Sequence, residues 1–599
     1  MIPELQYPFD GDYILAHKKK LKKQLLSTCP GGVSHDFIPK KIAVLGGSTT
    51  HDICLILELF LLNDGILPEF YESEYNQYYQ DAMFPNPVLE EFSPDLIYIH
   101  TTNRNITQYP EVNMTAEEID ALLEAETERF AGMWGRLAEV YRCPVIQNNF
   151  EYPDHRILGN LDAADIHGAV NFVTRLNQKF YEYAQTHEKF YIHDINYISS
   201  CYGLDRWSDP FYWHMYKYAC AVPAIPTLAF NLARIVRAIF GKNKKGFVTD
   251  LDNTLWGGVV GDDGVEGLEI GQETSMGQAY AEFQSYLKKL KGLGLILNVD
   301  SKNDEENALA GLNHPSGVLR PEDFIIVKAN WEPKDRNFAA IAEELNLLPE
   351  SLVFLDDNPA ERAIVCGQLP GVCAPPLDRV ENYIRLIDRG GYFETISLSA
   401  DDRKRNAMYR ENAERKKLQA SFASYEEYLL SLEMTAQIRP FEPVYMARIA
   451  QLTNKSNQFN LTTRRCTQDE IERMAQSPEY ITLYGKLEDR FGDNGVVTVA
   501  AGRIHGDELD MILWLMSCRV LKRDMEYAMM DVLVSRARTA GVRQINGFYC
   551  PTAKNGMVKD FYALQGFEKV REAEDGSTAW KLSVDDYEPR NHVIRVRED

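Results

Sequence analysis

The stretch FVTDLDNTLWGG, residues 247–258, places two aspartates one residue apart directly after an apolar run. The apolar run predicts a buried strand. Asp250 and Asp252 would repel each other unless a cation, a proton or a bound ligand lies between them. The end of this strand is therefore expected to be a ligand site.

Three further apolar runs follow, and each ends in polar or charged residues: GLILNVD (294–300), DFIIVK (323–328) and SLVFLDD (351–357). Longer helix-like stretches separate them. Short strands that alternate with helices predict a parallel sheet covered on both faces. Ligands of open α/β sheets lie at the carboxyl ends of the strands, so the polar residues after these four strands are expected to converge.

These polar residues suit Mg²⁺ and a phosphoryl group. Carboxylates are hard ligands for Mg²⁺, and an ammonium and a hydroxyl can bind phosphate oxygens. In strand order they are Asp250 and Asp252, then Ser301 and Lys302, then Lys334, then Asp356 and Asp357. A surface turn would explain Asp-x-Asp-x-Thr alone, but four elements in order favour a site. The assignment fails if Lys334 or Asp357 points away from Asp250.

The order Asp-x-Asp-x-Thr, Ser, Lys, Asp-Asp resembles the haloacid dehalogenase (HAD) superfamily of phosphotransferases. The resemblance implies that Asp250 is the nucleophile and Asp252 the acid and base. Thr254 would steady the loop, while Ser301 and Lys334 would hold the phosphoryl oxygens. It implies Mg²⁺ ligation by Asp250, Asp252, Asp356 and Asp357, and substrate binding by Asn253, Lys302, Asn303 and Asn358. Only 50 residues separate Asp250 from Asp300, which leaves room for a minimal cap.

Longer motifs are similar to the FkbH-type branch of the HAD proteins over roughly residues 245–570. They include DLDNTLWGGVVGDDG, ANWEPKDRN, FLDDNPAER, TNKSNQFNLTTRR and GFYCPTAKNGMVKDFYALQGF. Such proteins resemble enzymes that dephosphorylate 1,3-bisphosphoglycerate and load its glyceryl group onto a phosphopantetheinylated acyl carrier protein, in polyketide and related biosynthesis. The resemblance implies these partners, a small phosphorylated acid and a carrier protein. A simple phosphatase with non-catalytic outer domains is the alternative.

One residue departs from that pattern. The acyl-transferring members carry a cysteine before the Ser-Lys-Asn of the second strand, and this position is Asp300 here. An aspartate cannot form the thioester, whereas phosphatase chemistry survives the change. Asp300 is equally interpreted as an ordinary residue at the end of the strand that faces solvent.

The first segment resembles SGNH-type hydrolases through VLGGSTTHD (44–52), IHTTNRN (99–105) and DPFYWH (209–214). The resemblance implies Ser48 as a nucleophile, Asn103 as an oxyanion donor, and Asp209 with His214 as the rest of a triad. The Asp-to-His spacing is wider than in that family. The favoured interpretation is that Ser48 caps the following helix.

The third segment resembles the GNAT acyltransferase fold. Lys522 and Asp524 replace both glycines of the turn that would give backbone N–H groups to coenzyme A, so acetyl-CoA use is not expected. A domain that accepts a pantetheine arm or docks a carrier protein is expected instead. Cys518 is a candidate acyl-transfer thiol, although free cysteines are usually buried as small apolar residues. The Lys/Arg-rich stretch 403–417 is a candidate positive surface for an acidic carrier, or simply a solvated helix.

The predicted fold class is therefore α/β with three domains: an SGNH-hydrolase-like domain with a flavodoxin-like sheet (1–240), a HAD-like Rossmannoid domain (244–390) and a GNAT-like domain (396–585). A formal charge of −24 argues against non-specific binding to nucleic acid or an anionic membrane. No signal sequence is apparent, the longest apolar run (53–62) is far short of a span, and no Cys-x-x-Cys pair occurs among ten cysteines. These features predict a cytoplasmic protein.

Overall fold

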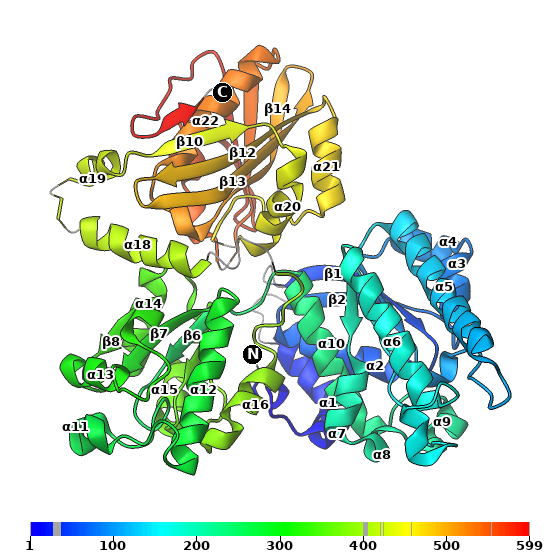
Figure 1. Ribbon diagram of the computed structural model, residues 1–599. Coiled ribbons are helices and arrows are strands. Elements are labelled where there is room, and N and C mark those ends of the chain that lie inside the picture. Colours follow the sequence, from blue (N-terminus) through cyan, green and yellow to red (C-terminus); the bar gives the residue numbers. More distant parts are fainter. Residues whose placement is uncertain are drawn as a thin grey trace. The chain divides into compact units, whose positions relative to one another are not determined.

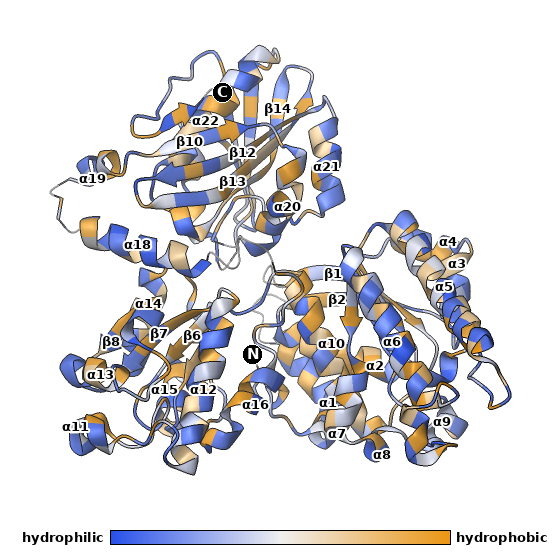
Figure 2. Cartoon of the chain, viewed as in Figure 1, coloured by the Kyte–Doolittle hydropathy of each residue, from blue (hydrophilic) through white to orange (hydrophobic). Residues whose placement is uncertain are grey.

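The computed structural model describes residues 2–27, 37–398, 405–419, 421–422, 424–456, 458–552 and 554–597. The chain forms two compact units, Met1–Ile239 and Phe240–Asp599. Figure 1 shows that each unit is built from strands covered by helices, and Figure 2 shows that the apolar residues gather on the strands and the helix faces that meet them. The expected α/β class is confirmed.

The first unit contains a five-stranded parallel sheet in the order β2-β1-β3-β4-β5. The strands are β1 (Ile38–Gly46), β2 (Ile66–Glu72), β3 (Leu96–His100), β4 (Val145–Asn148) and β5 (Phe190–His193). The helices are α1 (Gly11–Ser27), α2 (His51–Asn63), α3 (Tyr78–Met83), α4 (Pro87–Phe92), α5 (Ala116–Tyr141), α6 (Ala169–Thr186), α7 (Ile195–Tyr202), α8 (Leu204–Trp207), α9 (Pro210–Tyr216) and α10 (Ile225–Ile239). Residues of β3 are wholly buried, which explains their continuous apolar run.

One stretch of this unit, Val222–Ile239, is long and apolar enough to cross a membrane by length and composition. It includes α10, and 72% of it is buried inside the structure. α10 packs against α2, as a core helix does.

The second unit begins with a four-stranded parallel sheet in the order β8-β7-β6-β9. Its strands are β6 (Gly246–Thr249), β7 (Ile296–Ser301), β8 (Val327–Ala329) and β9 (Leu352–Leu355), which confirms the four predicted strands. The helices are α11 (Val260–Asp263), α12 (Ser275–Gly292), α13 (Glu305–Leu312), α14 (Lys334–Glu344), α15 (Pro359–Gln368) and α16 (Val380–Gly390). Alternate strand residues enter two apolar clusters, one on each face: Phe247 packs in one and Val248 in the other.

The chain order of these strands reverses beside β6. The chain passes from β6 to β7 and β8 on one side and then returns to place β9 on the other side. Such a switch point leaves a crevice at the carboxyl ends of the two central strands, and ligands bind there in open α/β sheets.

The rest of this unit forms a larger, mostly antiparallel sheet, in the order β16-β17-β15-β14-β13-β12-β10-β18, with β11 paired to β14. Its strands are β10 (Thr435–Arg439), β11 (Phe459–Asn460), β12 (Tyr480–Asp489), β13 (Gly492–His505), β14 (Glu508–Met516), β15 (Gln544–Tyr549), β16 (Glu568–Glu572), β17 (Thr578–Ser583) and β18 (Arg595–Arg597). The helices are α18 (Arg405–Gln419), α19 (Tyr425–Ser431), α20 (Met446–Lys455), α21 (Gln468–Gln476), α22 (Met525–Thr539) and α23 (Phe561–Leu564).

Candidate active site

Strand register brings three aspartates into one row at the switch point of the parallel sheet. Thr249 of β6 pairs with Val299 of β7 and with Leu355 of β9. The next residue on each strand is Asp250, Asp300 or Asp356, so the three lie side by side across adjacent strands. Neighbouring strands are about 4.8 Å apart, and the row therefore concentrates acidic groups at the carboxyl edge.

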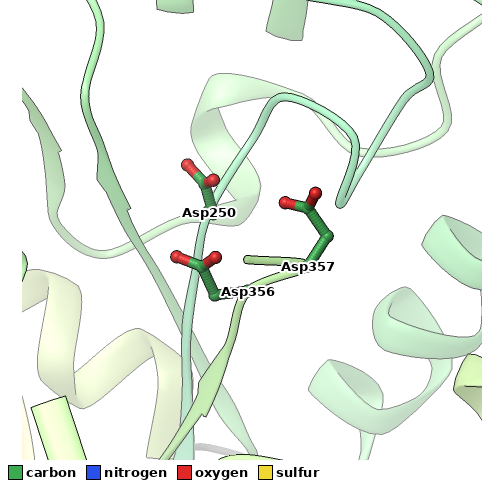
Figure 3. A group of neighbouring side chains, drawn as sticks. All are labelled: Asp250, Asp356 and Asp357. Carbon is green, nitrogen blue, oxygen red and sulfur yellow. The ribbon is translucent and has the colours of Figure 1, made fainter. Parts of the chain in front are cut away.

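Asp250, Asp356 and Asp357 form a compact carboxylate group. One ligand oxygen from each lies within 4.8 Å of the other two. Figure 3 shows the three side chains turned toward a common space, from the end of β6 and from the turn after β9. Asp250 is 8% exposed and Asp356 is fully buried, so solvent screens their mutual repulsion poorly.

Lys334, at the start of α14, supplies the positive charge of this site. Its Nζ lies 2.9 Å from Asp250 Oδ2 and 2.5 Å from Asp356 Oδ2. The side chain is almost completely buried, and the two carboxylates raise its pKa against the effect of burial. Lys334 is therefore held as an ammonium, as the sequence prediction of a convergent site requires.

Thr254 and Arg362 fix the turn that carries Asp356 and Asp357. The backbone N–H of Asp357 donates to Thr254 Oγ1 at 3.1 Å. Arg362 Nη1 donates to the backbone oxygens of Asp356 and Asp357, both at 2.7 Å. Sequence reasoning missed Arg362, although it lies in the quoted motif FLDDNPAER.

Asp252 is not part of the compact group, and three hydrogen bonds hold its side chain. Its Oδ1 accepts from Trp256 Nε1 at 2.9 Å and from the backbone N–H of Val260 at 3.0 Å, and its Oδ2 accepts from Asn303 Nδ2 at 2.9 Å. The predicted ligation of a metal by the Asp252 side chain therefore differs from this geometry. Burial raises its pKa in spite of these hydrogen bonds, which favours a carboxyl group that can hold a proton.

The other predicted site residues lie at the carboxyl edge of the parallel sheet, and several of them already make structural contacts there. Ser301 ends β7 and is buried. Lys302 is partly exposed and pairs with Glu361 at 2.6 Å. Asn358 caps α15 by accepting from the backbone N–H of Ala360. Asn253 has a φ of 55° and accepts from the backbone N–H of Gly258, so its side chain stabilises the turn after β6.

Asp300 is the least compensated acid of the row. It is fully buried, and neither of its carboxyl oxygens makes a hydrogen bond of ordinary geometry with the residues that the structure describes, although the Asn337 side chain lies near enough to oppose the rise in its pKa. Burial raises its pKa to about 8, although the charge of Lys334 opposes this. Burial and the charge of Asp250 likewise raise the pKa of Asp356 to about 6. The Lys334 ammonium thus supplies one positive charge beside three aspartates, which would carry three negative charges if all of them ionised.

This donor set fits Mg²⁺. The ion takes oxygen ligands at about 2.1 Å in octahedral geometry, so oxygens that share it lie on the order of 3–4 Å apart. One oxygen from each of Asp250, Asp356 and Asp357 lies within 4.8 Å of the other two, which is close to that spacing. A divalent cation would also offset the negative charge that Lys334 leaves uncompensated.

Comparisons with known proteins agree with this architecture. The model of the FkbH N-terminal domain matches residues 41–237. A crystal structure of the N-terminal part of the protein BF1531 from Bacteroides fragilis, which contains a phosphatase domain and is complexed with Mg, is 30% identical. It covers 63% of this chain and 99% of its own, with a TM-score of 0.57. The chain belongs to the FkbH-like family.

Two acetyltransferase structures also match this FkbH-like chain. The ribosomal-protein-S18-alanine N-acetyltransferase of Escherichia coli is 12% identical and covers 25% of this chain and 94% of its own, with a TM-score of 0.20. A GNAT-family acetyltransferase of Streptococcus pneumoniae is 15% identical and covers 25% of this chain and 98% of its own, with a TM-score of 0.21. No curated protein matches the sequence.

The predicted triad of the first unit is not assembled in this FkbH-like protein. Asp209 caps α9 by accepting from the backbone N–H of Phe211 at 2.9 Å. His214 is exposed on the same helix, and no hydrogen bond joins it to Asp209 or Ser48 among the described residues. Ser48 does not cap α2 either, since Thr50 holds the N-cap position. The Ser48 Oγ is buried without a hydrogen-bond partner among the described residues.

A different acid lies at the carboxyl edge of this first sheet. Asn103 Nδ2 donates to Glu151 Oε1 at 3.0 Å, and the Thr102 hydroxyl donates to the same oxygen. Glu151 is 3% exposed, and burial raises its pKa to about 7. The predicted oxyanion donor Asn103 is thus bound to a carboxyl group. Sequence reasoning missed Glu151, whose signal was the run NNFE (148–151), which begins at the last residue of β4.

In the C-terminal sheet, Cys518 is half-buried and packs against apolar clusters. Among the described residues it has no contact with the carboxylate group. Lys522 and Asp524 have φ values of 62° and 59°, so they adopt the left-handed backbone that glycine usually supplies. Asp524 stands at the N-cap of α22, and burial raises its pKa. Its position keeps a potential negative charge at this helix start.

Proposed function

We propose that this chain is a Mg²⁺-dependent phosphatase of the FkbH type, with Asp250 as its nucleophile. The observation that carries the proposal is the convergence of Asp250, Asp356, Asp357 and the Lys334 ammonium at the switch point of the parallel sheet. The similarity to a Mg-bound phosphatase-containing structure supports it.

The side chains divide the reaction into two displacements. An Asp250 oxygen attacks phosphorus, a P–O bond to the leaving group breaks, and Asp252 gives its proton to the departing oxygen. Asp252 then takes a proton from water, whose oxygen attacks phosphorus and releases Asp250 and inorganic phosphate. The raised pKa of Asp252 suits this exchange of roles. Lys334 and Ser301 hold phosphoryl oxygens, and Thr254 keeps Asp357 in place.

Bound at Asp250, Asp356 and Asp357, Mg²⁺ would supply positive charge that reduces repulsion between the nucleophile and the phosphoryl group. The substrate that we propose is a small phosphorylated acid such as 1,3-bisphosphoglycerate. Asp250 removes its ester phosphate, and the pantetheine thiol of an acyl carrier protein attacks the acyl-phosphate carbonyl, so that the thioester forms and the second phosphate leaves. The family resemblance supports this finer assignment.

A second candidate is a phosphatase without acyl transfer. Asp300 favours it, because a buried carboxyl group stands where the acyl-transferring members carry a cysteine. The outer domains would then recruit a carrier-tethered or small phosphate ester.

One experiment separates the two candidates. The protein is incubated with Mg²⁺, 1,3-bisphosphoglycerate and a holo-carrier protein, after which released phosphate is measured and the carrier is weighed. Phosphate release with a glyceryl mass gain supports transfer, and release without that gain supports the simple phosphatase. If neither occurs with this or any other phosphorylated acid tested, both candidates are wrong. An Asp300→Cys variant that acquires acylation would further support the second candidate.

A further inference from the structure

The Lys/Arg-rich stretch 403–417 is not a free positive surface for an acidic partner. Arg415 is buried and lies 2.7 Å from Asp489. Lys416 Nζ donates to the backbone oxygen of Glu344 at 2.6 Å. Residues 403 and 404 lie outside the described residues. Any positive docking surface must therefore be sought elsewhere on this acidic chain.

Helix α1 carries five lysines within six residues, 18–23. Successive helix positions are about 100° apart, so the lysines after the bend at His17 fall on one side, about 200° wide. Buried Leu21 and Leu25 occupy the opposite side. The basic side consists of Lys18, Lys19, Lys20, Lys22 and Lys23.

Two of these lysines are neutralised and three are not. Lys18 pairs with Asp52 at 2.8 Å, and Lys22 pairs with Glu58 at 2.7 Å. Lys19, Lys20 and Lys23 are exposed, with no ion pair among the described residues. Residues 19, 22, 23, 26 and 27 line an open surface depression. A polar rim around an exposed apolar residue, here Leu26 at 41%, is typical of a protein-binding surface.

An aromatic cluster continues this basic surface. Asp52, the partner of Lys18, also accepts a hydrogen bond from the Tyr218 hydroxyl. The Tyr218 ring lies 6.3 Å from the Tyr216 ring, which lies 6.1 Å from the Phe211 ring. Phe211, Met215 and Tyr216 are each more than half exposed. Exposed apolar groups gathered beside a charged rim mark an interaction site.

The aromatic cluster also reaches the carboxyl edge of the first sheet. The Thr49 hydroxyl donates to the backbone oxygen of Tyr216 at 2.7 Å, and the Thr49 N–H donates to that of Lys217 at 2.9 Å. A partner bound on this surface would therefore stand beside the residue that follows Ser48. We call this surface the Lys/Tyr face, and it comprises Lys18, Lys19, Lys20, Lys22, Lys23, Leu26, Phe211, Met215 and Tyr216.

We propose that the Lys/Tyr face docks the acidic carrier protein, a partner that rests on the proposed function. Charge complementarity favours this occupant: an acidic protein is repelled by a chain of net charge −24 except at a local basic surface. An anionic membrane fits less well, because polybasic lipid-binding segments carry about four to eight basic residues, and only three lysines of this face are unpaired among the residues that the structure describes. The apolar residues of the face suit the hydrophobic contacts of a folded protein partner.

The test measures binding of a purified holo-acyl carrier protein to the full chain at low and high salt. Lys19→Glu/Lys23→Glu is compared with Arg136→Glu/Lys179→Glu, an equal charge change on partly exposed, ion-paired residues of α5 and α6. We expect the first pair to raise Kd about tenfold or more and the second to change it less than about twofold. Phe211→Ser/Tyr216→Ser should also raise Kd, through loss of apolar contact.

Several results would overturn the proposal. The first is that the wild-type chain does not bind the holo-carrier. The second is that both pairs of charge substitutions weaken carrier binding equally. The third is that Lys19→Glu/Lys23→Glu loses binding to vesicles with 20% phosphatidylglycerol but still binds the carrier. Phosphatase activity toward a small phosphate ester, measured on the same preparations, reports on the proposed function separately. Carrier binding without phosphatase activity would contradict the proposed function and support the docking surface. Phosphatase activity without carrier binding would support the proposed function and contradict the docking surface.

Discussion

The two parallel sheets of this protein carry polar residues at their carboxyl edges in opposite ways. In the second unit, carboxylates from β6 and β9 converge with a buried ammonium at one point. In the first unit, the Ser48 Oγ has no hydrogen-bond partner among the described residues, Asn103 binds Glu151, and Asp209 caps a helix. Convergence of charge leaves a site that only a cation or proton can complete, whereas Asn103 and Asp209 are satisfied by local hydrogen bonds. The former arrangement indicates catalysis, and the latter indicates structure or docking.

The largest expected effect tests the convergent site. Asp250→Asn removes the nucleophile while it keeps the shape of the side chain, so phosphate release should fall at least about a thousandfold. Release is measured at saturating Mg²⁺, with Glu332→Gln as a control, because Glu332 is an exposed acid near the same edge. If Asp250→Asn keeps a tenth of the activity, another group is the nucleophile.

Lys334→Met tests whether one ammonium balances the row of acids. The change leaves Asp250 and Asp356 buried without their shared partner, which should lower the free energy of unfolding by about 3–5 kcal/mol in EDTA. Because Mg²⁺ can take over this charge balance, it should raise the melting temperature more in the variant than in the wild type. Lys302→Met, at a partly exposed ion pair, should cost less than about 1 kcal/mol. Equal Mg²⁺ shifts in wild type and Lys334→Met would contradict the shared-partner account.

The fold class and the convergent site could be predicted because both follow from local sequence patterns. Parallel strands bring their carboxyl ends together, so an aspartate after β6 and another after β9 had to approach each other. The orientation of each side chain does not follow from this rule. Asp252 accepts from Trp256, four residues further along the same loop, and from Asn303, whose position is fixed only by the tertiary fold. Arg362 acts on backbone oxygens, and a motif of side chains gives no sign of such a contact.

In the first unit, the sequence did not allow the arrangement of the site residues to be predicted. Ser48, Asn103 and His214 lie in stretches that resemble those of a hydrolase, but a triad depends on distances between loops and helices. Those distances come from packing, and here Asp209 is used to begin α9. Burial of Arg415 in a run of charged residues was equally beyond prediction, because its partner Asp489 lies 74 residues away.

Asp300→Asn tests how the buried Asp300 carboxyl group makes the free energy of unfolding depend on pH. The folded-state pKa of Asp300, about 8, lies above the value of about 3.9 in the unfolded chain. The folded protein therefore binds this proton more tightly, and the stability that it contributes is lost as pH rises toward 8. Relative to Asp300→Asn, the wild type should lose up to about 1.4 kcal/mol per pH unit between about pH 4 and pH 8. Unfolding midpoints in EDTA from pH 5 to pH 8 measure this, and parallel curves would show that Asp300 is ionised throughout.

Ser48→Ala carries the smallest expected effect and tests the dispersed edge. Because the Ser48 Oγ is buried without a hydrogen-bond partner among the described residues, its removal should change the free energy of unfolding by no more than about 1 kcal/mol. Hydrolysis of p-nitrophenyl acetate should be the same as in the wild type. Asn103→Ala offers a matched contrast, because it removes a donor from the buried Glu151 carboxyl group and should cost about 1–3 kcal/mol. The wild type could instead have an esterase activity that Ser48→Ala abolishes. In that case a base from α9 must reach Ser48, and the carboxyl edge of the first sheet would be a second active site.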